Sequence, residues 1–94
     1  MSDEQLIARH LIVHGRVQGV FYRDWTVKTA RESGLVGWVR NLPDGTVEAH
    51  IEGTPGSVDR MVSAMQQGPP RADPTRIEQE EAPICKFPTF DRRA

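Results

Sequence analysis

The hydrophobic and polar residues near the start of the chain follow a strand pattern and then a helix pattern. Ile7, Leu11 and Val13 share one parity within residues 6–14, with Arg9 the exception, and the other parity forms a mixed face of apolar residues and histidines, which predicts a half-buried strand. From Tyr22 to Ser33, aromatic and small residues recur at spacings of three and four, which is the period of a helix. Gly34 follows at the position where a left-handed residue commonly ends a helix.

The middle of the chain predicts a β-hairpin. Residues 35–42 are rich in β-forming side chains, and apolar and polar residues alternate over 46–52. Between these runs stands the turn sequence Pro43-Asp44-Gly45. We therefore expect two antiparallel strands joined by a tight turn.

A second helix is predicted after the hairpin. Thr54 is suited to cap its first turn, and Pro55 has its φ angle preset for the first helical position. Apolar residues then recur at i, i+3, i+4 and i+7, and Gly68 with the two prolines after it ends the helix. The apolar residues of this face are Val58, Met61, Val62 and Met65.

The rest of the chain has weaker patterns. We expect a loop at residues 71–76, a strand at Arg76–Ala82 and a short edge strand at Ile84–Phe90. The resulting order βαββαβ predicts an α+β fold of the ferredoxin-like plan, an antiparallel sheet with two helices on one face. The 94 residues leave room for one core, so residues 1–94 are expected to form a single domain.

This topology brings two separate segments together. The strands at 6–14 and 35–42 should run in the same direction with the 46–52 strand between them, so that their carboxyl ends share one sheet edge. Two strand spacings amount to roughly 10 Å. The loop that carries Arg23 and the strand end that carries Asn41 should therefore reach one ligand of phosphate size.

Composition narrows the class of protein. There is no run of about 18 apolar residues and the polar start does not resemble a signal peptide, so we expect a cytoplasmic protein with no membrane contact. A single cysteine cannot form an internal disulfide, and His10, His14 and His50 have no paired metal-ligand spacing. We expect neither a disulfide nor a metal.

The charges are unevenly distributed although the formal net charge is only -1. Residues 9–40 hold six basic side chains against two acidic ones, while residues 44–81 hold eight acidic side chains against three arginines. A basic first half suits a small anion. Solvated faces of helices and strands would give the same count, so charge alone does not decide.

The segment from Gly15 to Arg23 is a candidate anion-binding loop. It leaves a strand and enters a helix, its two glycines permit positive φ, and the helix start adds unpaired N–H groups and partial positive charge. Arg23 can grip two phosphate oxygens at once. The alternatives are that Asp24 neutralises Arg23, or that the turn binds nothing, because neither GxxxxGK[ST] nor GxGxxG is present.

Asn41 is the second candidate. Before Pro-Asp-Gly, an asparagine commonly starts a turn by bonding its own backbone. In a functional site, its neutral amide would position a water molecule without repelling a phosphate dianion. Both interpretations remain open at this stage.

Two long segments carry a family resemblance. The sequences VHGRVQGVFYR, residues 13–23, and GWVRNLPDGTVEAHIEG, residues 37–53, resemble the two signature segments of the acylphosphatases. The resemblance runs from about residue 6 to the end. Tyr22 stands where the family usually has Phe or Met, and the ending from Phe90 to Ala94 departs from the usual Phe-x-Ile.

The resemblance implies the hydrolysis of acyl phosphates to a carboxylate and inorganic phosphate, without metal or cofactor. It implies that Arg23 and Asn41 are catalytic, with Asn41 orienting the attacking water. The implied phosphate-binding residues are Arg16, Val17, Gln18, Gly19, Val20, Phe21, Tyr22 and Arg23. A carboxylate leaving group has a conjugate acid of pKa about 4 to 5 and departs without a general acid, and phosphoryl transfer depends mainly on positioning and electrostatics, so this small site would suffice.

Other functions remain possible for this pattern. One is a non-catalytic phosphate-binding or regulatory domain of the same fold. Another is RNA binding, which the scattered aromatics and the acidic 46–52 strand disfavour, so no nucleic acid partner is expected. Neither helix has a second apolar face, so we expect a monomer. The histidines are expected on strand surfaces, Cys85 half-buried, and both tryptophans packed, with Trp38 a candidate neighbour of the site.

Overall fold

The computed structural model describes residues 5–94, so the first four residues of the polar start, and of the expected 1–94 domain, lie outside the described residues. Five strands and two helices follow one another along the chain. Their bounds are β1 (Ile7–Arg16), α1 (Tyr22–Glu32), β2 (Val36–Asn41), β3 (Val47–Gly53), α2 (Pro55–Gln67), β4 (Asp73–Ala82) and β5 (Phe90–Arg93). None of the helices in the described part of the chain has the length and apolarity needed to cross a membrane.

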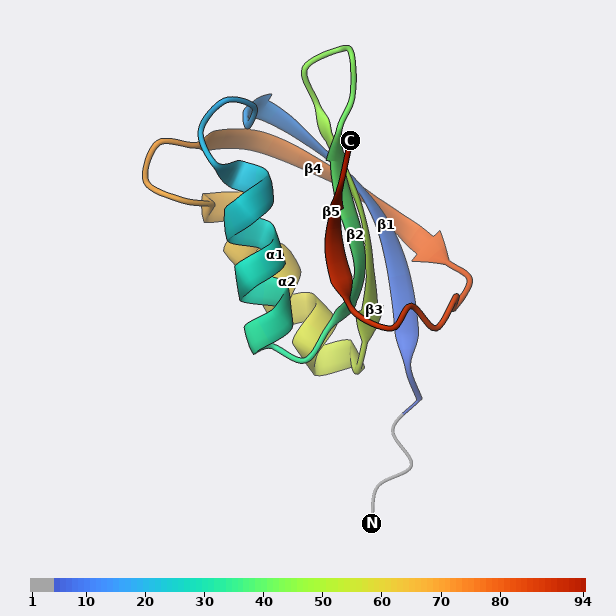
Figure 1. Cartoon of the computed structure of the whole chain (residues 1–94). Helices are drawn as coiled ribbons and strands as arrows, with labels where there is room; N and C mark the ends of the chain where they lie inside the picture. Colours follow the sequence, from blue (N-terminus) through green and yellow to red (C-terminus); the bar gives the residue numbers. More distant parts are fainter. Residues whose placement is uncertain (1–4) are drawn as a thin grey trace.

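The strands form one sheet in the order β4-β1-β3-β2-β5, and both helices lie on the same face of it (Figure 1). β3 pairs antiparallel with β1 and with β2, so β1 and β2 run in the same direction with β3 between them. The predicted ferredoxin-like plan is confirmed. It directs the end of β1, the start of α1 and the end of β2 to one edge of the sheet.

The end of the chain differs from the prediction in two ways. The short edge strand expected at Ile84–Phe90 is wrong: the chain crosses the end of the sheet there, and β5 begins only at Phe90. β5 pairs parallel with β2, so the sheet is not purely antiparallel. This pairing joins segments about 50 residues apart and depends on a long crossing that no local pattern reveals.

β4 begins earlier than expected. The segment 71–76 was predicted as a connecting loop, but the strand starts at Asp73 and includes Pro74. β4 is an edge strand of the sheet, paired only with β1 among the described strands. An edge strand tolerates proline because one side of it has no ladder bonds to lose.

The core lies between the sheet and the two helices. α2 contributes the four residues predicted for its apolar face, all of them buried, and α1 contributes Tyr22, Thr26 and Ala30. The Tyr22 hydroxyl donates a hydrogen bond of 2.7 Å to the Met65 carbonyl and so links the helices. Burial raises the pKa of Tyr22 far above its ordinary value, which keeps this hydroxyl a donor. The core therefore fixes the first residue of α1 and the loop before it.

Candidate active site

A cavity of about 260 Å³ lies where the β1–α1 loop, the end of β2 and the strand β5 meet. It is bordered by residues from all of these segments. They are Val17, Gly19, Phe21, Tyr22, Arg23, Asp24, Asn41 and Arg92. Arg23 and Asn41, which the topology was expected to bring together, border the same cavity.

The β1–α1 loop has an unusual backbone. Gly15 has φ +111, and a Cβ there would lie 2.3 Å from the Asp73 carbonyl oxygen, so only glycine fits beside β4. Gly19 and Phe21 also have positive φ, at 72 and 64. Within residues 5–94, no hydrogen bond to another protein group engages the backbone N–H of residues 18–21. These donors are free to bind a ligand.

The side chains of the loop hold it in place. Val17, Val20 and Tyr22 are buried in the core. Gln18 Nε2 donates to the carbonyls of Leu42, at 2.9 Å, and Thr46, at 2.8 Å, which fastens the loop to the β2–β3 turn. Of the predicted phosphate-binding residues, Arg16, Gln18 and Val20 do not border the cavity. The Gln18 side chain binds the β2–β3 turn and the Val20 side chain lies in the core, so any role of these two residues in binding falls to their main chain.

Arg23 stands in the first turn of α1 without a carboxylate partner. Its Nη1 donates to the Arg93 carbonyl at 3.2 Å. Asp24, which we considered as its neutralising partner, instead pairs with Arg92 at 2.8 Å. In the described part of the chain Arg23 makes no ion pair. A cation at a helix N-terminus without a counter-ion suits an anionic ligand.

Asn41 ends β2 and has an unmatched acceptor. Its Oδ1 is buried and is the one buried side-chain N or O atom without a hydrogen-bond partner among residues 5–94. An unpaired buried acceptor costs about 1–3 kcal/mol, so it is not expected without a use.

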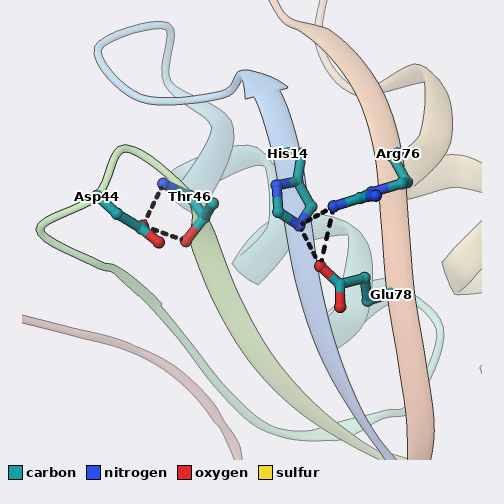
Figure 2. Close-up of polar contacts among 5 residues, drawn as sticks. All are labelled: His14, Asp44, Thr46, Arg76 and Glu78. Carbon is teal, nitrogen blue, oxygen red and sulfur yellow. Dashed lines mark hydrogen bonds and ion pairs between the residues drawn. The ribbon is translucent and has the colours of Figure 1, made fainter.

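The turn after β2 does not depend on Asn41. Leu42 N–H donates to the Thr46 carbonyl at 2.9 Å, and Gly45 N–H donates to the Leu42 carbonyl at 3.1 Å. Asp44 Oδ1 accepts from Thr46 N at 3.0 Å and from Thr46 Oγ1 at 2.6 Å, as Figure 2 shows. The hydrogen bond from the Thr46 hydroxyl, with that from its N–H, lowers the pKa of Asp44. The turn-starting interpretation of Asn41 is therefore wrong.

A family profile described as Acylphosphatase matches residues 9–91. An acylphosphatase of Acidiphilium cryptum is 48% identical over 89 residues, which is 95% of this chain and 98% of that protein. An acylphosphatase of Rubrobacter xylanophilus is 55% identical over 82 residues, 87% of this chain and 74% of that protein.

A solved acylphosphatase structure from Coxiella burnetii matches with a TM-score of 0.92 and 34% identity, covering 99% of this chain and 100% of the other. The chain belongs to the acylphosphatase family. Its relatives are hydrolases that act on acyl phosphates. The family resemblance drawn from the two sequence segments is confirmed.

Arg92 was not among the predicted site residues of this family member. It stands in the C-terminal segment, at the position of the isoleucine in the family's Phe-x-Ile ending, and borders the cavity beside Asp24. The one feature of the sequence that could have pointed to Arg92 was the departure of this ending from the family pattern. Phe90 keeps the other part of the pattern and is fully buried. Trp38 does not border the cavity, and its ring lies 4.9 Å below the Arg93 guanidinium.

The three histidines lie on the face of the sheet opposite the helices, each beside a glutamate. His10 contacts Glu48, and His14 contacts Glu78, which also accepts from Arg76 (Figure 2). His50 is 6% exposed, so its expected place on a strand surface is wrong, because Trp38 stacks on it and Phe87 packs edge-on. None of these histidines borders the cavity.

Glu52 fastens the chain that crosses to β5. Its carboxylate accepts from Cys85 N at 2.7 Å, from Lys86 N at 3.0 Å and from His50 at 2.6 Å. Burial acts to raise the pKa of Glu52, but these hydrogen bonds together hold it below its ordinary value. Cys85 is exposed, contrary to expectation. The ligand atoms of His50, Glu52 and Cys85 lie within 4.8 Å of one another, which their spacing in sequence does not suggest.

Proposed function

We propose that this chain hydrolyses acyl phosphates by the direct attack of a water molecule that Asn41 orients. One observation carries the proposal. In the described part of the chain, one cavity is bordered by Arg23, which has no counter-ion, by Asn41, which has an unmatched amide oxygen, and by Gly19 and Phe21, which have partner-free backbone N–H groups. The arginine and the backbone N–H groups suit a phosphoryl group, and the amide oxygen suits a water molecule.

The phosphoryl group binds to the β1–α1 loop and to Arg23. Backbone N–H groups of residues 16–22 donate to its equatorial oxygens, and the guanidinium of Arg23 donates to two of them. The anchoring of the loop by Gln18, Val17 and Val20 supports this role, because donors held in place need no reorganisation as charge develops in the transition state.

The water molecule donates a hydrogen bond to Asn41 Oδ1 and attacks the phosphorus. The new bond joins the water oxygen to phosphorus, and the bond between phosphorus and the acyl oxygen breaks with its electron pair leaving on the carboxylate. One water proton passes to a phosphoryl oxygen and the other stays on the attacking oxygen, so RCO₂PO₃²⁻ and H₂O become RCO₂⁻ and H₂PO₄⁻. In this proposal the substrate phosphate itself accepts the proton, and neither a metal nor a cofactor takes part.

A non-catalytic phosphate-binding or regulatory domain is the main alternative. Such a domain would use the loop and Arg23 in the same way, but it would gain nothing from a buried amide oxygen left unmatched beside them. Asn41 therefore favours hydrolysis over binding alone.

The proposal is tested by steady-state hydrolysis of benzoyl phosphate and acetyl phosphate. We expect turnover of both, competitive inhibition by inorganic phosphate, and an unchanged rate in EDTA. Phosphate binding without turnover would refute the enzyme in favour of the binding domain. Inhibition by EDTA would refute the metal-free mechanism.

We further propose that residues 1–94 act as one domain and as a monomer in the cytoplasm, without nucleic acid. Among residues 5–94 the exposed large hydrophobic residues are limited to Leu6, Phe21 and Ile84, which supports a monomer. The sedimentation of the purified protein measures this directly, and a dimer at micromolar concentration would contradict it.

A further inference from the structure

The geometry points to Arg92 as the residue that selects substrates carrying a second anionic group on the acyl portion. This inference rests on the proposed hydrolysis of acyl phosphates and adds the class of acyl group that this chain prefers. The cavity holds two guanidinium groups, and the phosphoryl group requires only one of them. The second, on β5, remains for another part of the substrate.

Arg92 is held at the cavity and is still able to exchange partners. Its Nη1 lies 2.8 Å from Asp24 Oδ1, and the two side chains are 51% and 59% exposed. A pair as exposed as this contributes little to stability, so a ligand carboxylate can replace or share the contact. Asp24 thus keeps the guanidinium at the cavity until an anion arrives.

Attachment of β5 does not explain the Asp24–Arg92 pair. Arg31 on α1 already donates to the Phe90 carbonyl at 2.9 Å and pairs with Asp91 at 3.3 Å, and the Phe90 ring is buried in the core. These contacts fasten β5 to α1 at Phe90 and Asp91, one or two residues before Arg92. The pair at the cavity adds little to that attachment.

The neighbouring arginine provides a matched control. Arg93 carries the same charge one residue further along, but its guanidinium lies over the rings of Trp38 and Phe87, on the sheet face opposite α1. Replacing either arginine by glutamine removes one positive charge from β5, and only Arg92 borders the cavity. The two variants therefore distinguish a direct contact between Arg92 and the substrate from a general effect of positive charge on β5.

The test compares two substrates that differ in one charge, 4-carboxybenzoyl phosphate and 4-carbamoylbenzoyl phosphate. The measured quantity is the ratio of their kcat/KM values. We expect Arg92→Gln to lower this ratio about fivefold, the effect of about one exposed ion pair, and Arg93→Gln to leave it unchanged. Asp24→Asn should raise the ratio, because it frees Arg92 and removes a competing carboxylate.

An unchanged ratio in Arg92→Gln, an equal fall in Arg93→Gln, or a fall in Asp24→Asn would each overturn the inference. These failures are distinct from a failure of the proposed function. In that case the wild-type protein would hydrolyse neither substrate, and benzoyl phosphate would be stable as well.

Discussion

Replacing Asn41 by alanine should abolish most of the turnover without destabilising the fold. Its Oδ1 is buried and unmatched in the described structure. This oxygen makes no hydrogen bond to another protein group among the described residues, so its removal breaks no polar contact that holds the fold together. We therefore expect the free energy of unfolding to change by less than about 1 kcal/mol. Loss of one aimed group lowers turnover by about 10²-fold to 10³-fold, about 3–4 kcal/mol of barrier.

The assay measures kcat on benzoyl phosphate, the inhibition constant of inorganic phosphate and urea unfolding, on the same preparations. The inhibition constant should stay nearly unchanged, because the oxygen binds water rather than phosphate. Gln18→Ala is the contrasting variant. It deletes two hydrogen bonds that fasten the loop, to Leu42 and Thr46, and should lower the free energy of unfolding by about 1–3 kcal/mol.

Two results would refute this reasoning. If Asn41→Ala kept its turnover, the amide would not orient the water. If the variant lost turnover together with more than about 2 kcal/mol of stability, as a buried structural residue would, the unmatched acceptor would have been misinterpreted.

Three further outcomes are expected. Arg23→Lys should raise the inhibition constant of phosphate at least about tenfold in competition assays, because lysine keeps the charge and loses the two-point grip; unchanged inhibition would contradict this. Glu52→Gln should make stability less dependent on pH in urea unfolding between pH 3 and 6. The Glu52 pKa is lowered in the fold, so its contribution is complete above the unfolded value of about 4.3 and is lost as pH falls below it; an equally steep fall in the variant would contradict this. Phe21→Gly should raise the melting temperature, because Phe21 has φ 64 and is 74% exposed, and a lower temperature would show that the ring contributes packing.

The local patterns predicted most of the fold because each depends on near neighbours. The cap at Thr54, where Oγ1 accepts from Ser57 N at 3.4 Å, and the left-handed Gly34 stand where their residue types indicated. The strand predicted at 46–52 buries Val47, Ala49 and Ile51, as its period indicated, but His50 and Glu52 on its other face are buried as well. The βαββαβ order then allowed few arrangements, and the convergence of Arg23 and Asn41 followed from it.

The errors lie where distant segments decide the structure. The segment 71–76 was predicted as a loop, but pairing with β1 makes the strand begin at Asp73, and the edge position tolerates Pro74. His50 was assigned to the surface by its parity in the strand, but Phe87 from the crossing segment covers it. Arg92 reaches the cavity only because β5 pairs parallel with β2. The contact of Phe87 with His50 and the position of Arg92 both depend on the path of residues 83–89, which carries no periodic signal.

The most direct test of the central claim is a titration of the ¹⁵N-labelled protein with inorganic phosphate, followed by amide chemical shifts. The account holds that the main chain of the β1–α1 loop and the guanidinium of Arg23 together grip the phosphoryl group. It predicts saturable shifts that are largest for the amides of residues 16–22 and for Arg23 Nε. Saturable shifts concentrated elsewhere would contradict it, for example shifts around Thr75 and Arg76, which border a separate cavity between the end of α2 and the start of β4.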